Sequence, residues 1–289
     1  MGKAHKVKGE LLDAVVMVDL LQTFKDVADN KFFTLVGQKD KFRRFGETFI
    51  EFFRMISMTK VRHPLVSNDN PLMGILVVTI EGSFLGQFNN RIIGRAMEEY
   101  EKHPKSKFIV IGYKGVDQLK KITPDAKVFT EMEVNGIYET AVTVKNYLVD
   151  EVMNNRLGKV MVVYSWPKSF DTQKPKTLKL LPCDELVSKQ IQLIESFDKV
   201  IEESDPMAVI GSLSDLWNTT RLYQIFMDTV IASAAAQAQF LEESVDKMKK
   251  EKAKVLMRYR KARKSDIDKG LRETFAARMM TMQAASTRS

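Results

Sequence analysis

The stretch that most resembles a chemical site is IEGSFLGQFNNRIIG, residues 80–94. It follows an apolar run and leads into a segment with helical spacing, and a glycine-bearing turn between a strand and a helix often holds a phosphate group. The dinucleotide-binding fingerprint needs two glycines two residues apart and a third one three residues later. The glycines here are Gly82, Gly86 and Gly94, so the spacing does not match that fingerprint.

The stretch does not fit a P-loop either. A P-loop ends in a lysine followed by serine or threonine, whereas Gly86 is followed by Gln87 and Phe88. Phe84 and Phe88 would also crowd a bound phosphate. We therefore expect a structural turn in which Gly86 supplies backbone freedom, either at positive φ or at a close approach of another backbone. We expect Asn89 to cap the following helix, since asparagine favours that position.

Residues that bind metals or act as nucleophiles are few. The three histidines, His5, His63 and His103, are far apart and have polar neighbours, and the single cysteine is Cys183. No recognisable ligand spacing for zinc results from this set. We expect no catalytic residue, no cofactor and no metal site in this chain.

The positions of the prolines indicate how the chain is organised. The first proline is Pro64 and the last is Pro206, so both ends of the chain lack proline. Because proline breaks helix interiors, this pattern predicts long helices flanking a mixed domain. We expect a coiled-coil helix in 1–62, an α/β domain in 70–183, and a C-terminal region, 184–289, that is mainly a long helix.

Apolar residues recur every seventh position near both ends of the chain, as they do in coiled coils. The N-terminal series is Ala14, Leu21, Ala28, Leu35, Phe42, Phe49 and Ile56, with Met17, Phe24, Phe45 and Phe52 three residues after some of its members. The C-terminal series is Met227, Ala234, Leu241, Met248, Val255 and Ala262, with Ile231, Ala238, Val245 and Tyr259 at the second seam position.

These patterns predict that the two ends pair with each other. A C-terminal helix of about 80 residues would extend roughly 120 Å, farther than a compact domain of this size. It therefore needs a partner, and we expect an antiparallel coiled coil with the N-terminal helix. A bend or break is expected near Gly37, because glycine weakens helix interiors.

The middle of the chain alternates between short apolar runs and amphipathic segments. Strands are predicted at 75–80, 107–113, 159–166 and 177–182, and helices at 89–103, 115–122 and 135–155. This alternation is typical of an α/β domain with a mainly parallel, Rossmann-like sheet.

The charge is unevenly distributed. The chain has a net charge of +8, and ten Lys or Arg residues lie between 247 and 264 with only Glu251 opposing them. Like charges on one helix repel, so an acidic partner would relieve this run; the alternative is a solvated helix face. A nucleic-acid backbone is a weaker candidate partner, since only Tyr259 could stack on bases. The candidate contact residues are Lys247, Lys249, Lys250, Lys254, Arg258 and Arg263.

The turn at 81–89, EGSFLGQFN, resembles a motif of the gamma subunit of F-type ATP synthases, the central rotor shaft. That family carries D-R-G-L-C-G-x-x-N after its first sheet strand. Gly86 and Asn89 match this motif, and Glu81 keeps the acidic character of its first position.

Two further segments carry the resemblance to this family. Residues 162–182, VVYSWPKSFDTQKPKTLKLLP, are similar to its Q-x-P and L-L-P segment, with Gln173 and Pro175 in place. Residues 259–277, which begin with Tyr259, are similar to its Y-N-K-A-R segment. The order helix, α/β domain, helix also agrees. The family's A-S-E-x-x-x-R-M segment is only echoed, so the chain resembles a divergent member.

The resemblance implies a non-catalytic subunit of a proton-translocating F-type ATP synthase, which couples rotation of the membrane ring to ATP synthesis in the alpha/beta hexamer. The implied partners are the alpha and beta subunits, epsilon/delta-type central-stalk subunits and the membrane c-ring, with no nucleic acid. No apolar run is long enough to span a membrane. The implied location is the matrix side of the mitochondrial inner membrane or, alternatively, the cytoplasmic side of a bacterial plasma membrane.

Other functions remain open at this point. The chain could be the shaft of a related, repurposed rotary ATPase. It could also be a basic coiled-coil interaction protein, including one that binds nucleic acid, or a nucleotide-dependent enzyme built on the α/β domain.

Overall fold

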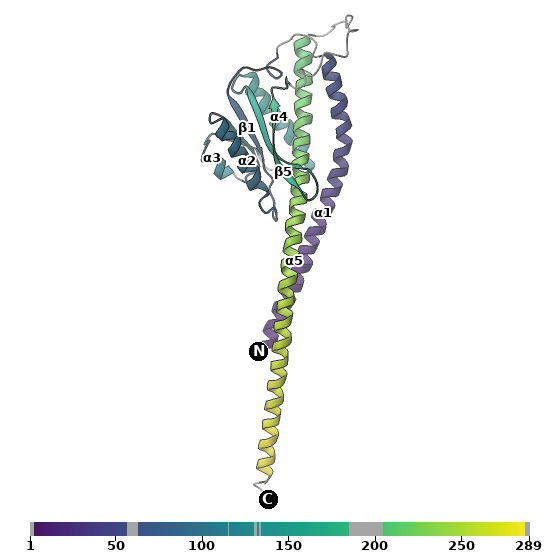
Figure 1. Ribbon diagram of the computed structural model, residues 1–289, viewed down its shortest axis with the longest axis vertical. Helices are drawn as coiled ribbons and strands as arrows, with labels where there is room; N and C mark the ends of the chain where they lie inside the picture. The colour runs from purple at the N-terminus through teal and green to yellow at the C-terminus, as the bar shows by residue number, and fades with distance from the viewer. Residues whose placement is uncertain are drawn as a thin grey trace. The chain divides into compact units, whose positions relative to one another are not determined.

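A computed structural model describes residues 3–56, 63–114, 116–129, 132, 134–184 and 205–286 (Figure 1). Two units can be distinguished, residues 1–27 with 238–289 and residues 28–237. The elements, in order, are α1 (Lys3–Ile56), β1 (Met73–Val78), α2 (Phe88–Lys102), β2 (Lys107–Ile111), α3 (Val116–Lys120), β3 (Lys127–Phe129), a 3-10 turn (Val134–Gly136), α4 (Ile137–Met153), β4 (Lys159–Pro167), β5 (Gln173–Leu181) and α5 (Pro206–Ser286).

The second unit contains a five-stranded mixed sheet in the order β3-β2-β1-β4-β5. Strands β1 to β4 are parallel, and β5 returns antiparallel beside β4. The expectation of an α/β domain with a mainly parallel sheet is thus confirmed. The short edge strand β3 was not predicted, and β5 begins at Gln173, four residues before the predicted strand.

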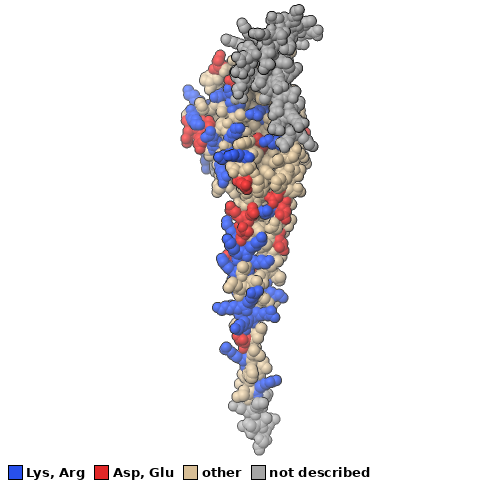
Figure 2. Space-filling view, turned by 45° about the vertical axis from the view of Figure 1, so that its right-hand side comes forward, with Lys and Arg blue, Asp and Glu red and all other residues tan. Residues whose placement is uncertain are grey.

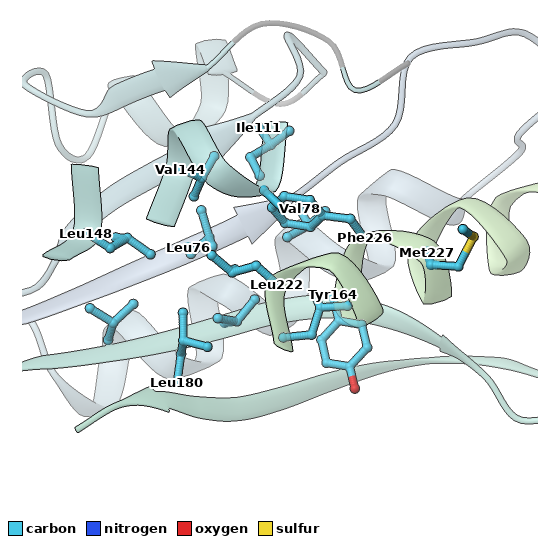
Figure 3. Packing of buried hydrophobic residues seen from close by; sticks show 14 of the residues in the cluster. Leu76, Val78, Ile111, Val144, Leu148, Tyr164, Leu180, Leu222, Phe226 and Met227 are labelled. Carbon is cyan, nitrogen blue, oxygen red and sulfur yellow. The ribbon is translucent and has the colours of Figure 1, made fainter. Parts of the chain in front are cut away.

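Alternation along β1 divides the core of this unit into two layers. Ile75 and Val77 pack against α2, while Leu76 and Val78 lie in a larger cluster with α4 and α5. Figure 3 shows this larger cluster, with Leu222 and Phe226 of α5 beside Leu76 and Val78. A strand buried on both faces reads as a continuous apolar run, which explains the sequence MGILVV.

The helices α1 and α5 pack together in antiparallel fashion (Figure 1). In the first unit the backbone N–H of Ala4 donates to the Asp266 carboxylate at 3.0 Å, and Arg258 pairs with Glu10 at 3.3 Å. In the second unit Lys39 pairs with Asp228 at 2.5 Å. Because α5 numbers fall as α1 numbers rise in the first unit, the predicted antiparallel pairing is confirmed.

The predicted seam of α5 is confirmed, since Leu241, Val245, Val255 and Ala262 are all buried. On α1, Leu21, Ala28 and Leu35 are buried as predicted, but the second seam position was wrong. Met17 and Phe24 are 44% and 47% exposed, whereas Val18 and Phe32, four residues after members of the series, are buried. The side chains predicted at 42–56 lie outside the described part.

Of the bend or break expected near Gly37, the break does not occur, because α1 is continuous from Lys3 to Ile56. A Cβ added at Gly37 would meet nothing within 4 Å, so this glycine has no packing role there. In the described residues, no helix is both long enough and apolar enough to cross a membrane.

Candidate functional site

The turn between β1 and α2 adopts the backbone conformation that its glycines predict. Gly86 has φ 53° and Gly82 has φ 143°, and Phe84, between them, also has a positive φ of 61°. Positive φ is costly for residues with a side chain, so the expected need for backbone freedom at Gly86 is confirmed. Three alternate residues of the turn, Gly82, Phe84 and Gly86, thus have positive φ and redirect the chain as it leaves the strand.

Glu81 connects this turn to the loop after β2. Its carboxylate accepts hydrogen bonds from the backbone N–H groups of Tyr113, at 2.6 Å, and Lys114, at 2.9 Å. Backbone N–H groups at the carboxyl end of a strand are the donors that hold phosphate in many nucleotide sites. Here the chain's own carboxylate engages those two donors.

Asn89 does not cap α2, and the expectation of a cap was wrong. The residue at the N-cap is Gln87, without a side-chain capping bond. The amide of Asn89 instead donates to the carbonyl of Ile80 at 2.8 Å and accepts from its N–H at 3.1 Å. The side chain thus pairs with the backbone at the end of β1 as a neighbouring strand would, and joins helix to strand.

A third contact closes the carboxyl ends of β1 and β2. The Thr79 hydroxyl donates to the Ile111 carbonyl at 2.6 Å. Gly112, at φ 82°, is so close that an added Cβ would lie 2.8 Å from the Thr79 hydroxyl oxygen. These strand ends, where open α/β sheets usually bind ligands, are filled by the chain's own groups.

A polar hollow of about 320 Å³ remains beside the turn. Lys114 is its one ionisable lining residue, and the others are Gly82, Phe84, Leu85, Gly86, Asn89, Asn90 and Ile93. Neither an acid–base pair nor an activated nucleophile is present in this lining. Within the described residues, no group of three His, Cys, Asp or Glu side chains could hold a metal ion.

The turn also contacts the long C-terminal helix. The side-chain amide of Gln237, on α5, donates to the carbonyl of Ser83 at 3.1 Å. The turn therefore contacts β1, the loop after β2 and α5 together. This arrangement is suited to bracing the sheet against the helix.

The basic run of α5 forms an exposed surface in the first unit, and Figure 2 shows Lys and Arg gathered along that length of the helices. Three of its cations make ion pairs: Lys247 with Glu243, Lys254 with Glu251, and Arg258 with Glu10. The structure brings all six predicted contact residues onto this exposed surface, and Lys249, Lys250 and Arg263 make no ion pair with a described residue. Positive charge therefore exceeds negative charge on this surface of the folded chain.

The remaining motif residues lie apart from this surface. Tyr259 is partly buried in the helix seam with Val7, Val255 and Ala262, so its position is structural. Gln173 and Pro175 begin β5, an edge strand, where a proline costs no ladder hydrogen bond. The Glu81 carboxylate bridge was missed by sequence reasoning, although its acidic character at a motif position was a usable signal.

These features define a protein with two long antiparallel helices and an α/β domain. In this domain the chain's own groups occupy the carboxyl ends of β1 and β2. A family model described as ATP synthase matches residues 19–277. The ATP synthase gamma chain of Symbiobacterium thermophilum is 25% identical over 219 residues, covering 74% of this chain and 75% of the relative. That of Actinobacillus pleuropneumoniae serotype 3 is 22% identical over 284 residues, covering 96% and 98%.

Solved structures agree on the fold. A chain of the Euglena gracilis mitochondrial ATP synthase, in an OSCP/F1/c-ring structure, aligns with a TM-score of 0.64 at 15% identity, covering 98% of this chain and 95% of that one. A central stalk/c-ring chain from Tetrahymena thermophila gives 0.59 at 15% identity, covering 78% and 99%. The chain belongs to the ATP synthase gamma chain family, the non-catalytic central-stalk subunits of the F-type enzyme.

Asn89 provides a test of the turn. We expect Asn89→Ala to lower the free energy of unfolding by about 1–2 kcal/mol, since it removes two hydrogen bonds to Ile80 and leaves part-buried backbone groups unpaired. Asn90→Ala is the matched control, because among the described residues the exposed Asn90 side chain bonds the Gln87 side chain and not the strand. Urea denaturation measures both variants. Equal losses would show that Asn89 does not join the strand to the helix.

Proposed function

We propose that this chain is the rotor shaft through which rotation of a membrane ring is coupled to ATP synthesis in an alpha/beta hexamer. The observation that carries the proposal is the exposed basic surface of α5 on an antiparallel helix pair. Shaft function needs torsional stiffness and an asymmetric surface rather than a reactive side chain. Two helices packed along a buried seam resist twisting and bending better than one helix does.

The basic surface supplies the asymmetry. Its charges lie on one helix of the pair, so rotation about the helix axis would bring them past surrounding subunits in turn. An acidic segment on a catalytic subunit would be attracted when the surface faces it and released when the surface turns away. In this proposal Lys247, Lys249, Lys250, Lys254, Arg258 and Arg263 make that contact.

The α/β domain would contact the remaining stalk subunits and the ring. We propose the c-ring and an epsilon/delta-type subunit as its partners, with protons as the coupling ions. The titles of the similar mitochondrial structures include a c-ring, which supports the ring as a partner. The chain would be peripheral to its membrane, on the matrix side of the mitochondrial inner membrane or the cytoplasmic side of a bacterial plasma membrane.

Isolation of the native complex tests this function. We expect the tagged chain, extracted from membranes in mild detergent, to be recovered with alpha, beta and ring subunits at one copy of the chain per three alpha/beta pairs. Intact-complex mass spectrometry measures that ratio. Recovery of the chain without catalytic subunits, or with bound nucleic acid instead, would contradict the rotor function.

A further inference from the structure

The tip of the β4–β5 hairpin contacts α1 through three aromatic rings. Phe170 lies in this hairpin, and its ring centroid is 5.1 Å from that of Phe32 in an edge-on arrangement and 6.1 Å from that of Phe33 in a stacked one. Phe32 is 7% exposed and Phe33 is 65% exposed. Aromatic pairs at these separations stabilise beyond the area they bury, so Phe170 engages a buried and an outer ring of α1.

Two hydrogen bonds within the β4–β5 hairpin fix the loop that contains Phe170. The side-chain amide of Gln173, which is 9% exposed, donates to the Phe170 carbonyl at 2.5 Å. The backbone of Lys168 donates to the Thr172 carbonyl at 3.0 Å, which closes the tip. The motif residue Gln173 therefore has a structural role, since its hydrogen bond fixes the loop that places the ring of Phe170 against α1.

The aromatic contact distinguishes between axial positions of α1 that the apolar seam series alone does not distinguish. The first seam series of α1, Leu21, Ala28 and Leu35, repeats every seven positions, so a slip by one heptad would still place apolar residues at those positions. The pair Phe32 and Phe33 does not repeat at that interval. Seven residues earlier stand Lys25 and Asp26, and seven later stand Lys39 and Asp40. In a slip by one heptad in either direction, no aromatic ring of α1 would take the place of Phe32 or Phe33 against Phe170.

An ion pair selects the same register. Lys39 pairs with Asp228 of α5 at 2.5 Å, and a heptad slip in one direction would place Lys39 against Arg221 instead. Burial raises the pKa of Asp228, and the Lys39 ammonium, which donates to it, opposes that rise. A buried carboxylate without its cation would be costly, so this contact also disfavours displacement of α1.

We propose that the β4–β5 hairpin is a clasp that fixes the axial position of α1 against the α/β domain, with Phe170 as its positioning residue and Gln173 as its support. A twist applied to the domain would then reach α1 through the clasp as well as α5 through the core. This consequence for torque rests on the proposed function. The clasp itself does not.

Hydrogen exchange of the full-length chain tests the clasp. We expect Phe170→Ala to accelerate exchange of the α1 amides in 28–39 roughly tenfold, because undocking of this segment becomes easier. Exchange in β1, β2 and β4 should stay within about twofold of the wild type. Phe170→Tyr should restore the slow exchange, since it keeps the ring. Tyr113→Ala, which removes a 61% exposed loop aromatic of the same domain, is the control and should change neither region.

Phe33→Ala gives a second measurement in case Phe170→Ala does not fold. This outer ring is largely exposed, so its removal should leave the fold intact while accelerating the same α1 amides about threefold. Unchanged α1 exchange in the variants, or an equal acceleration throughout the sheet, would overturn the clasp. Either result would leave the subunit composition of the native complex, and hence the rotor function, untouched.

Discussion

Reversing four lysines of the basic surface is expected to reduce ATP-driven ion transport by the assembled enzyme at least about tenfold, because repulsion would replace attraction at the proposed contact. The variant replaces Lys247, Lys249, Lys250 and Lys254 with glutamate. Free energies of unfolding should change by only about 1 kcal/mol, since exposed ion pairs contribute little to folding. Part of that small change would come from Lys247 and Lys254, which would then repel Glu243 and Glu251 on the same helix.

A matched reversal on the α/β domain is the control. Lys105, Lys120, Lys121 and Arg91 are exposed, and none of them makes an ion pair with a described residue. Their reversal gives the same change in net charge at a different place. Transport by both variants is measured in vesicles containing the reconstituted complex. If the control loses as much transport as the α5 variant, net charge rather than the basic surface is responsible.

The sequence predicts the pairing of the long helices better than the detail of their contact. Apolar side chains of α1 occupy more than one face, and both Met17 and Val18 follow Ala14 at an interval compatible with a coiled coil. Counting heptads therefore cannot choose between them. The choice is made by the seam of α5 and by packing on the sheet, which bury Val18 and leave Met17 44% exposed.

For the candidate turn, too, the sequence predicts some features and not others. Glycine spacing excludes a dinucleotide fingerprint and predicts positive φ at Gly86, because both follow from local backbone sterics. The role of Asn89 depends on a partner nine residues away. Its amide could form hydrogen bonds with backbone groups at a helix end or at a strand end. In the structure it bonds the backbone of Ile80, at the end of β1.

Contacts of single side chains between distant segments carried no readable sequence signal. Phe170 meets Phe32 across 138 positions of the chain, and neither residue type nor spacing indicates that contact. The three-residue strand β3 was missed for a different reason, since so short a segment shows no periodicity. Prediction succeeded for the long helices, the parallel strands β1, β2 and β4 and the first seam series of α1, and it failed where burial or a hydrogen bond depends on a single contact with another element.

Phe226→Ala is expected to lower the free energy of unfolding of the second unit by about 3–5 kcal/mol, the usual cost of emptying a buried phenylalanine site. Phe226 is 0% exposed, and Figure 3 shows it lying between α5 and β1, beside Val78. The loss would be a large share of the roughly 5–15 kcal/mol that stabilises a typical domain. In the proposed rotor function, α5 detached from the sheet would not receive torque from it.

Two tryptophans in this unit make the measurement direct. Trp166 lies in β4 and Trp217 in α5, and both pack against the same cluster as Phe226. Urea unfolding followed by their fluorescence gives the free energy for Phe226→Ala and for Leu216→Ala, a 45% exposed position of the same helix. The control should lose less than about 1 kcal/mol, since exposed positions create no cavity. Similar losses in the two variants would mean that α5 is not held to the sheet by this cluster, and the path for torque through the core would have to be abandoned.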